Sequence, residues 1–231
     1  MEIFSELFIF SLIPIKPDED KPQRRLKRAE QAAFSLSPEL TGILVGLFLG
    51  DLYVQKRKPQ WNPTLKFKQG IINSQYLMHL YGLFQSYCPS APKVHVGAPN
   101  KITGKINSYI AFHSYSLSCF NELYDLFYPN GKKVVPQNIG DLLTPSGLCY
   151  WICDDGYWDD NATFLCTNAF SLEEVNLLVK VLADKFNLKC SILRQKNGYV
   201  IRISSYSMPH LHTLVGSIIP PMMQYKVFGK S

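Results

Sequence analysis

Two short apolar stretches, each ending in an acid, dominate the pattern of hydrophobic and polar positions along this chain. Residues 44–52 read Leu-Val-Gly-Leu-Phe-Leu-Gly-Asp-Leu, and residues 148–156 read Leu-Cys-Tyr-Trp-Ile-Cys-Asp-Asp-Gly. Each stretch is long enough for roughly two turns of helix, which places Asp51 and Asp155 at the C-terminal ends. A carboxylate is disfavoured there, because the unpaired carbonyl groups already carry partial negative charge. Two such acids in one chain therefore predict a shared cation site.

Both stretches are preceded by residues that favour the start of a helix. Ser37 is followed by proline and Glu39, and Thr144 is followed by proline and serine. Serine and threonine cap the first turn with their side-chain oxygen, and proline suits the first helical position because its missing N–H would have no partner there. We therefore predict that both motifs lie on helices.

The order of elements after the first acid is repeated after the second. The patterns predict strands at residues 52–56, 64–69, 106–113, 163–167 and 199–204. They predict helices at residues 74–86 and 171–186, the second of which opens with the capping box Ser-Leu-Glu-Glu. We interpret this order as an α+β fold made of two diverged helix–strand–strand–helix–strand–strand–helix units.

The two units also end alike. The tripeptide Ser-Tyr-Ser follows the last predicted strand of each, and an apolar helix and a loop with a lysine come next, Lys133 in one unit and Lys226 in the other. Coincidence in a chain rich in serine and tyrosine is the alternative, but it does not explain the matching order. We predict an N-terminal extension at residues 1–36, a first subdomain at residues 37–138 and a second at residues 139–231.

Composition narrows the class of partner. The chain has 231 residues, of which 46% are hydrophobic and 18% are charged, as in a globular protein. Its 24 Lys and Arg against 18 Asp and Glu give a net charge of +6, which favours a polyanionic partner, although ordinary solubility charge is an equal explanation. The basic run at residues 24–28 is either part of a poorly ordered or helical arm or a tail that contacts nucleic acid.

Two further features argue against a membrane-spanning segment and a zinc-binding cysteine motif. The longest apolar run, residues 42–50, is far shorter than the roughly 20 residues that span a bilayer, so we expect no membrane partner. The six cysteines form no Cys-x-x-Cys pair and no zinc-binding spacing. Free thiols of this kind fit a reducing compartment.

The paired acids suit hydrolysis of a phosphodiester. Near neutral pH that reaction requires a positioned water and a cation that offsets the developing charge. If the two helices pack side by side, with Gly46 and Gly50 allowing a close approach, Asp51 and Asp155 meet and can hold Mg²⁺. Backbone carbonyls of Gly50 and Asp154 would complete the coordination.

Basic residues in both units could complete such a site and extend it along DNA. Lys133 and Lys226 would stabilise the transition state or contact the attacking water, while surface solvation is the alternative role for each. Within residues 64–69, Lys66 and Lys68 share one face of the predicted strand. The residues that we expect to contact phosphates or base edges are Lys56, Arg57, Lys58, Lys66, Lys68, Gln69, Lys101, Lys105, Arg194, Lys196 and Arg202.

The register of the last predicted hairpin stays open. Around Asn197 and Gly198, a two-residue turn mixes polar and apolar residues on both faces, whereas a longer loop would place Arg194 opposite Arg202. Both arrangements are compatible with the sequence.

Residues 37–231 resemble the LAGLIDADG homing endonucleases in their single-chain form, which carries two motifs. The likeness is closest to the organellar-intron subgroup typified by the yeast mitochondrial omega-intron enzyme. The most specific segments are residues 143–156, the Phe-Ser-Leu-Glu-Glu-Val of residues 170–175 and the Pro-Met-Met-Gln-Tyr-Lys of residues 221–226. The chain departs from the family pattern in two ways: Leu52 replaces the final glycine of the first motif, and Tyr150 and Trp151 are bulky where the second helix should pack closely.

The resemblance implies an activity and a site. It implies two αββαββα subdomains that form an antiparallel β saddle over a long site in double-stranded DNA, with the motif helices packed at the centre. Asp51 and Asp155 would be the metal-binding catalytic acids, and Lys133 and Lys226 the active-site lysines. The cofactor would be Mg²⁺, with Mn²⁺ as a substitute, and the product a staggered double-strand cut with 3′ overhangs. We expect a monomer whose gene lies inside a mitochondrial intron, with a chloroplast intron as the alternative.

Two binding functions compete with cleavage. An RNA maturase would use the same saddle to assist splicing of its host intron, with the intron RNA as its partner. A transcription factor with this fold would need neither acid. Because both acids are present, we favour the endonuclease.

Overall fold

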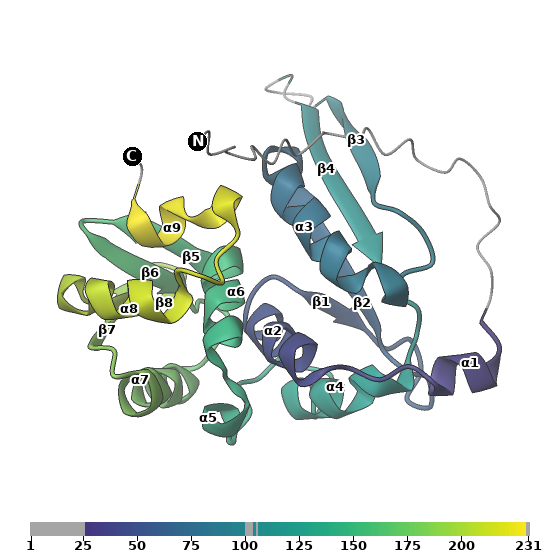
Figure 1. The fold of residues 1–231 in the computed structure, drawn as a ribbon, viewed down its shortest axis with the longest axis horizontal. Coiled ribbons are helices and arrows are strands. Elements are labelled where there is room, and N and C mark those ends of the chain that lie inside the picture. Colours follow the sequence, from purple (N-terminus) through teal and green to yellow (C-terminus); the bar gives the residue numbers. More distant parts are fainter. Residues whose placement is uncertain (1–25, 100–103, 105, 230–231) are drawn as a thin grey trace, which may run out of the picture.

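The fold consists of two similar halves on either side of a central pair of helices (Figure 1). The computed structural model describes residues 26–99, 104 and 106–229. The central helices are α2 (Pro38–Leu49) and α6 (Pro145–Asp155), which contain the two motifs. They begin as predicted, because Ser37 Oγ accepts a hydrogen bond from the N–H of Leu40 and Thr144 Oγ1 accepts one from Gly147.

Each half contains a four-stranded antiparallel sheet with the same strand order. The order is β1-β2-β4-β3 in the first half and β5-β6-β8-β7 in the second. This confirms the predicted α+β fold with its internal repeat. The first half contains α1 (Arg28–Ala32), α2, β1 (Tyr53–Gln55), β2 (Thr64–Gly70), α3 (Ser74–Phe84), β3 (Lys93–Pro99), β4 (Ile106–His113) and α4 (Asn121–Phe127). The second contains α5 (Ile139–Leu142), α6, β5 (Gly156–Asp159), β6 (Ala162–Cys166), α7 (Leu172–Phe186), β7 (Cys190–Gln195), β8 (Gly198–Ile203), α8 (Met208–Val215) and α9 (Tyr225–Phe228).

One face of each sheet packs against helices, and a single hydrophobic core runs through both halves. Leu65 and Phe67 of β2 belong to it, as do Ile201 and Ile203 of β8. The opposite face of the first sheet is exposed along β3, whereas that of the second carries the buried side chains of Ala162, Phe164 and Val200. In the part of the chain that the structure describes, no helix combines the length and apolar character that crossing a membrane requires.

Glycines allow α2 and α6 to approach each other closely. A Cβ atom added at Gly46 would lie 2.0 Å from the carbonyl oxygen of Gly147, and one added at Gly42 would lie 2.5 Å from Oγ1 of Thr144. The glycine spacing of the first motif therefore acts as predicted. The bulky residues of the second motif are accommodated: Trp151 is fully buried in the core, and the hydroxyl of Tyr150 lies 2.7 Å from Nε2 of His79 on α3.

Two details of the predicted repeat differ from the structure. The second Ser-Tyr-Ser forms the short 3₁₀ turn Ser205–Ser207, but the first extends the pairing with β2, because the amide of Ser114 donates to the carbonyl of Leu65 and its hydroxyl accepts from Leu65 N–H. Lys226 lies in α9 rather than in a loop, since the prolines before it start a 3₁₀ turn that leads into that helix.

The hairpin register that the sequence left open is that of a two-residue turn. Gln195 pairs with Gly198, so Lys196 and Asn197 form the turn. Arg202 then lies opposite Ser191, and Arg194 lies opposite Tyr199. Arg194 and Arg202 consequently point to opposite faces of the sheet.

The helix contact gives a testable prediction for stability. We expect Gly46→Ala to lower the free energy of unfolding by roughly 1–3 kcal/mol, because the added methyl group meets a backbone carbonyl that cannot move independently. Gly82→Ala is the matched control, since Gly82 lies within α3 and a Cβ atom there meets nothing within 4 Å. The control should unfold at the same or a slightly higher urea concentration. Equal stability of Gly46→Ala and the wild type would contradict the close packing.

Candidate active site

The C-terminal ends of α2 and α6 bring Asp51 and Asp155 together. Asp51 follows the last residues of α2, and Asp155 is the last residue of α6. Burial, together with the charge of Asp51, raises the pKa of Asp155 to about 7, against the opposing effect of Lys133 and Lys226. The two carboxylates therefore interact through space, as the sequence pattern predicted. A hollow between the halves is lined by both acids and by Lys133, which leaves room for a substrate beside them.

The two lysines occupy equivalent positions at these helix ends. Lys133 Nζ donates to the carbonyl of Gly50 at 2.5 Å and lies 3.4 Å from that of Leu49. Lys226 Nζ donates to the carbonyls of Cys153, at 2.5 Å, and Asp154, at 3.1 Å. Each ammonium group thus offsets the partial negative charge at the end of its own motif helix.

Burial and nearby acids act on the two ammonium groups in opposite directions. Burial lowers the pKa of both Lys133 and Lys226, and the charges of Asp51, Asp154 and Asp155 partly reverse that shift. The lysines and acids therefore form one electrostatic unit. The matched lysine positions in the sequence were the signal that located it.

The donor atoms at this site fit a hard divalent cation. Carboxylate oxygens of Asp51 and Asp155 and carbonyl oxygens of Gly50 and Asp154 lie at the same helix ends, and oxygen ligands are those that Mg²⁺ prefers. Among the described residues, no group of three or more His, Cys, Asp or Glu side chains forms a metal-binding cluster. A metal here would therefore be held by two carboxylates with backbone carbonyls, leaving positions for water and phosphate.

The side chain of Asp154 turns away from this pair. Its Oδ1 accepts a hydrogen bond from the hydroxyl of Tyr76 at 2.8 Å, and its Oδ2 accepts one from the amide of Asp51 at 3.1 Å. Burial raises the pKa of Asp154 to about 7, while the hydrogen bond from Tyr76 lowers it. Of the oxygens of Asp154, only the carbonyl faces the predicted metal site, and in this structure it accepts a hydrogen bond from Lys226. Nothing in the spacing of the sequence marked Tyr76 as its partner.

The open face of the first sheet is basic and aromatic. Lys66 and Lys68 lie on it as predicted, because the strand register pairs Lys66 with His113 and Lys68 with Ala111. The ring of Tyr109 stacks on His95 with centroids 4.7 Å apart, and Lys68 Nζ lies 4.1 Å from the centre of the Tyr109 ring. A hollow that reaches Asp51 is lined, among others, by Lys66, Lys68, Lys93, His95, Tyr109 and His113.

Sequence reasoning missed four of these open-face residues. Tyr109 and His113 alternate with the buried Ile110 and Phe112 of β4, and this alternation was the signal that could have found them. Lys93 and His95 join them through the pairing of β3 with β4. That pairing connects residues that no local pattern links.

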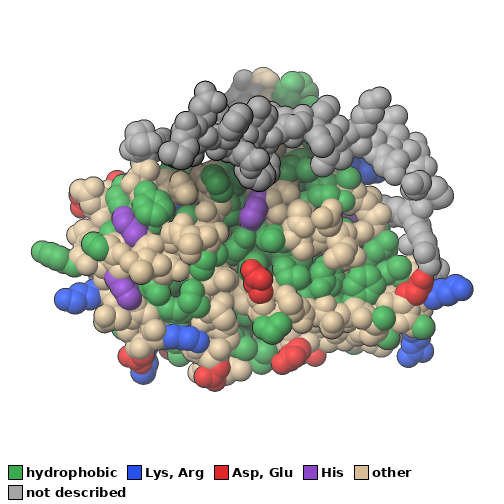
Figure 2. All heavy atoms as spheres, in the orientation of Figure 1, with side chains coloured by type: hydrophobic (Ala, Val, Ile, Leu, Met, Phe, Trp, Pro, Cys, Tyr) green, Lys and Arg blue, Asp and Glu red, His purple; other side chains and the backbone are tan. Residues whose placement is uncertain are grey.

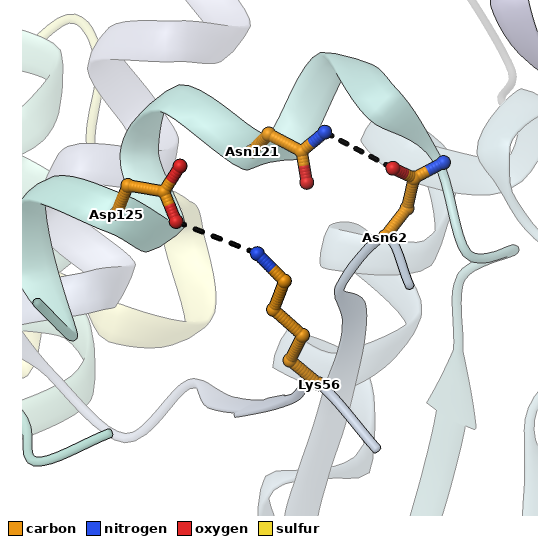
Figure 3. A network of polar contacts seen from close by, with 4 residues as sticks. All are labelled: Lys56, Asn62, Asn121 and Asp125. Carbon is orange, nitrogen blue, oxygen red and sulfur yellow. Dashed lines mark hydrogen bonds and ion pairs between the residues drawn. The ribbon is translucent and has the colours of Figure 1, made fainter. Parts of the chain in front are cut away.

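Two residues predicted to contact DNA do not share this face. Gln69 follows the register of Phe67, opposite Ile110, and its Oε1 accepts a hydrogen bond from Nδ2 of Asn73, although it still lines the hollow that reaches Asp51. Lys56 turns to α4, where its ammonium group lies 3.5 Å from a carboxylate oxygen of Asp125, beside the Asn62–Asn121 hydrogen bond (Figure 3).

The remaining predicted residues of the first half lie near the loop after β1 or outside the described residues. Arg57 lines a hollow with Trp61, Lys66 and His113, and Lys58 Nζ lies 5.0 Å from the centre of the Trp61 ring. Lys101 and Lys105 lie outside the described residues.

The corresponding face of the second sheet is apolar and more buried. Tyr157 and Phe164 stack with their centroids 5.0 Å apart, and they form a small apolar cluster with Ala162 and Val200 that is separate from the main core. Arg202 shares this face, with its guanidinium carbon 6.0 Å from the centre of the Phe164 ring. Arg194 lies on the other face, and Lys196 lies in the turn.

The side of the molecule in Figure 2 differs from the basic face of the first sheet. Hydrophobic side chains and an acidic one occupy the middle of its described part, and Lys and Arg side chains lie mostly towards the edges. This side therefore offers no continuous basic surface to a nucleic acid within the described residues. The open face of the first sheet is the better candidate.

The chain is similar to proteins of known family. Residues 41–211 match the LAGLIDADG DNA endonuclease family. The chain is 34% identical over 212 residues to the cytochrome b mRNA maturase bI2 of Debaryomyces hansenii, a match that covers 87% of this chain and 79% of the relative. It is 33% identical over 192 residues to a protein named "Probable intron-encoded endonuclease 1" from Wickerhamomyces canadensis, covering 80% of this chain and 81% of the relative.

A solved structure supports the same assignment. The homing endonuclease I-WcaI bound to its DNA recognition sequence matches with a TM-score of 0.80 and 30% sequence identity, covering 86% of this chain and 89% of that chain. The match spans both halves of the fold. The predicted family is thereby confirmed: the chain belongs to the LAGLIDADG DNA endonuclease family.

Proposed function

We propose that this chain is a site-specific DNA endonuclease that hydrolyses one phosphodiester in each strand of a long target site. The observation that carries the proposal is the pairing of Asp51 and Asp155 at the adjoining ends of α2 and α6, each with a lysine from its own half. One acid in each half matches one scissile phosphate in each strand. We expect a staggered cut with 3′ overhangs, which would serve intron homing.

A divalent metal, Mg²⁺ or Mn²⁺, would supply the charge that the phosphate develops and would activate the attacking water. The charges around Asp155 favour binding of such a metal. The raised pKa of Asp155 reports an excess of negative charge in a buried place, which a cation would relieve. Lys133 and Lys226 hold their ammonium groups at the helix ends, where they can offset charge on a phosphate that enters.

The outer faces of the two sheets would lie along the DNA. A two-stranded antiparallel ribbon fits the major groove, and the hairpins β3–β4 and β7–β8 provide one ribbon for each half. Lys66, Lys68 and Lys93 suit contacts to phosphates and base edges. Because one chain supplies both halves of the site, we propose that it acts as a monomer. The I-WcaI structure, bound to its DNA recognition sequence, favours double-stranded DNA as the partner.

A second function is supported by the names of two relatives, the cytochrome b mRNA maturases bI2 of Debaryomyces hansenii and Saccharomyces cerevisiae. Binding to the host intron RNA is therefore the alternative or additional role of this chain. A relative named for cytochrome b mRNA also favours a mitochondrial origin. Splicing of the host intron with and without the protein would reveal a maturase, whatever the outcome for cleavage.

The paired acids give a prediction for cleavage. With Mg²⁺ and DNA that carries candidate intron-insertion sites, we expect Asp51→Asn and Asp155→Asn each to slow double-strand cleavage by a factor on the order of 10² or more, because each removes a carboxylate charge that would hold the metal beside the scissile phosphate. Asp184→Asn is the control, since Asp184 lies on α7 and pairs with Lys180. Discrete double-strand cuts that persist in both acid variants would refute the proposed site.

The basic sheet face gives a prediction for binding. We expect Lys66→Gln and Lys68→Gln each to reduce the slope of log affinity against log salt by about one, because each substitution removes the positive charge that neutralises one phosphate. Lys180→Gln removes the same charge from exposed α7 and should leave the slope unchanged. Affinity would be measured over a salt series in the absence of cleavage. If the control lowers the slope as much as the sheet variants do, the DNA does not lie on this face.

A further inference from the structure

The two motifs differ in the residue before the acid. The first motif has Gly50 where the second has Asp154. In the structure these two residues face each other: a Cβ atom added at Gly50 would lie 2.5 Å from Cβ of Asp154 and 2.7 Å from its Oδ2. The glycine of one half therefore makes room for the additional acid of the other half.

The carboxylate of Asp154 reaches across to the backbone of Asp51. The turn after α2 is closed on both sides of Asp51, since the amide of Gly50 donates to Gly46 and that of Leu52 donates to Leu47. The amide of Asp51 instead donates to Oδ2 of Asp154 at 3.1 Å. Asp155 has a different support, because it is itself part of α6.

Tyr76 fixes the direction of the Asp154 carboxylate. Its hydroxyl donates to Oδ1 at 2.8 Å, and the Tyr76 side chain is fully buried on α3. Both oxygens of Asp154 thus accept hydrogen bonds from the first half. The Asp154 carboxylate is therefore engaged with Tyr76 and with the backbone of Asp51. Its role differs from that of the neighbouring Asp155.

We propose that Asp154 is a positioning residue, which holds the backbone of Asp51 and thereby aims the Asp51 carboxylate at the scissile phosphate of one DNA strand. This inference rests on the proposed function. Because Asp154 supports Asp51 and not Asp155, the site is asymmetric in its support although it is symmetric in its fold. Loss of Asp154 should slow the two strand cleavages unequally, since small misplacements of a catalytic group are costly.

The test is the rate of cleavage of each strand, measured with a target duplex labelled at both ends. We expect Asp154→Ala to slow one strand roughly 10-fold to 100-fold more than the other, so that nicked DNA accumulates. Tyr76→Phe should produce the same strand bias to a smaller extent. Asp154→Asn keeps an oxygen that can accept from Asp51 and should restore most of the balance.

A second measurement does not depend on catalysis. Hydrogen exchange of the Asp51 amide, followed by NMR in the protein without DNA, should be faster in Asp154→Ala and Tyr76→Phe than in the wild type. If Asp154→Ala does not fold, Tyr76→Phe and Asp154→Asn provide both readouts.

The outcomes separate this inference from the proposed function. Equal slowing of both strands, or unchanged exchange at Asp51, would overturn the positioning role while leaving the endonuclease in place. A wild-type protein that binds its target with Mg²⁺ and cuts neither strand would overturn the proposed function and the positioning role together. A strand bias together with faster exchange would establish the role.

Discussion

The close contact between α2 and α6 is the constraint on which the rest of the molecule depends. Gly46 meets the backbone of Gly147, so the helices touch without intervening side chains. This contact brings the two helix ends together, and with them Asp51 and Asp155. Any larger residue in the contact would separate the halves and the acids at once. This contact concentrates carboxylates and helix-end carbonyl groups in one place. Lys133 and Lys226 offset their negative charge.

The halves share a fold but not a chemistry. Both sheets have the same strand order, yet Lys66, Lys68 and Lys93 make the open face of the first basic, whereas Phe164 and Tyr157 make the corresponding face of the second largely apolar. A duplex lying across both sheets would be attracted electrostatically mainly by the first half. The second half would contribute van der Waals contacts. The pair of Gly50 and Asp154 adds an asymmetry at the centre. Divergence after duplication has thus changed the side chains while the framework stayed constant.

The framework and the acids were predictable because local patterns determine them. Caps, prolines and apolar runs mark α2 and α6, and the repeat relates Lys133 to Lys226. What could not be predicted depends on contacts between distant segments. Gln69 lies away from the basic face because of its register with Ile110, and Lys56 is diverted by Asp125 on α4. The hydrogen bond from Tyr76 to Asp154 joins two helices from different halves, and no periodicity within either helix could have revealed it.

Anomalous diffraction from manganese in crystals of the protein with a duplex selected by cleavage would locate the metal. If α2 and α6 form one cleavage centre, Mn²⁺ will be bound by carboxylate oxygens of both Asp51 and Asp155, and the Asp154 side chain will remain hydrogen-bonded to Tyr76 and the Asp51 amide. Manganese bound away from both acids in a complex with ordered DNA would contradict that account.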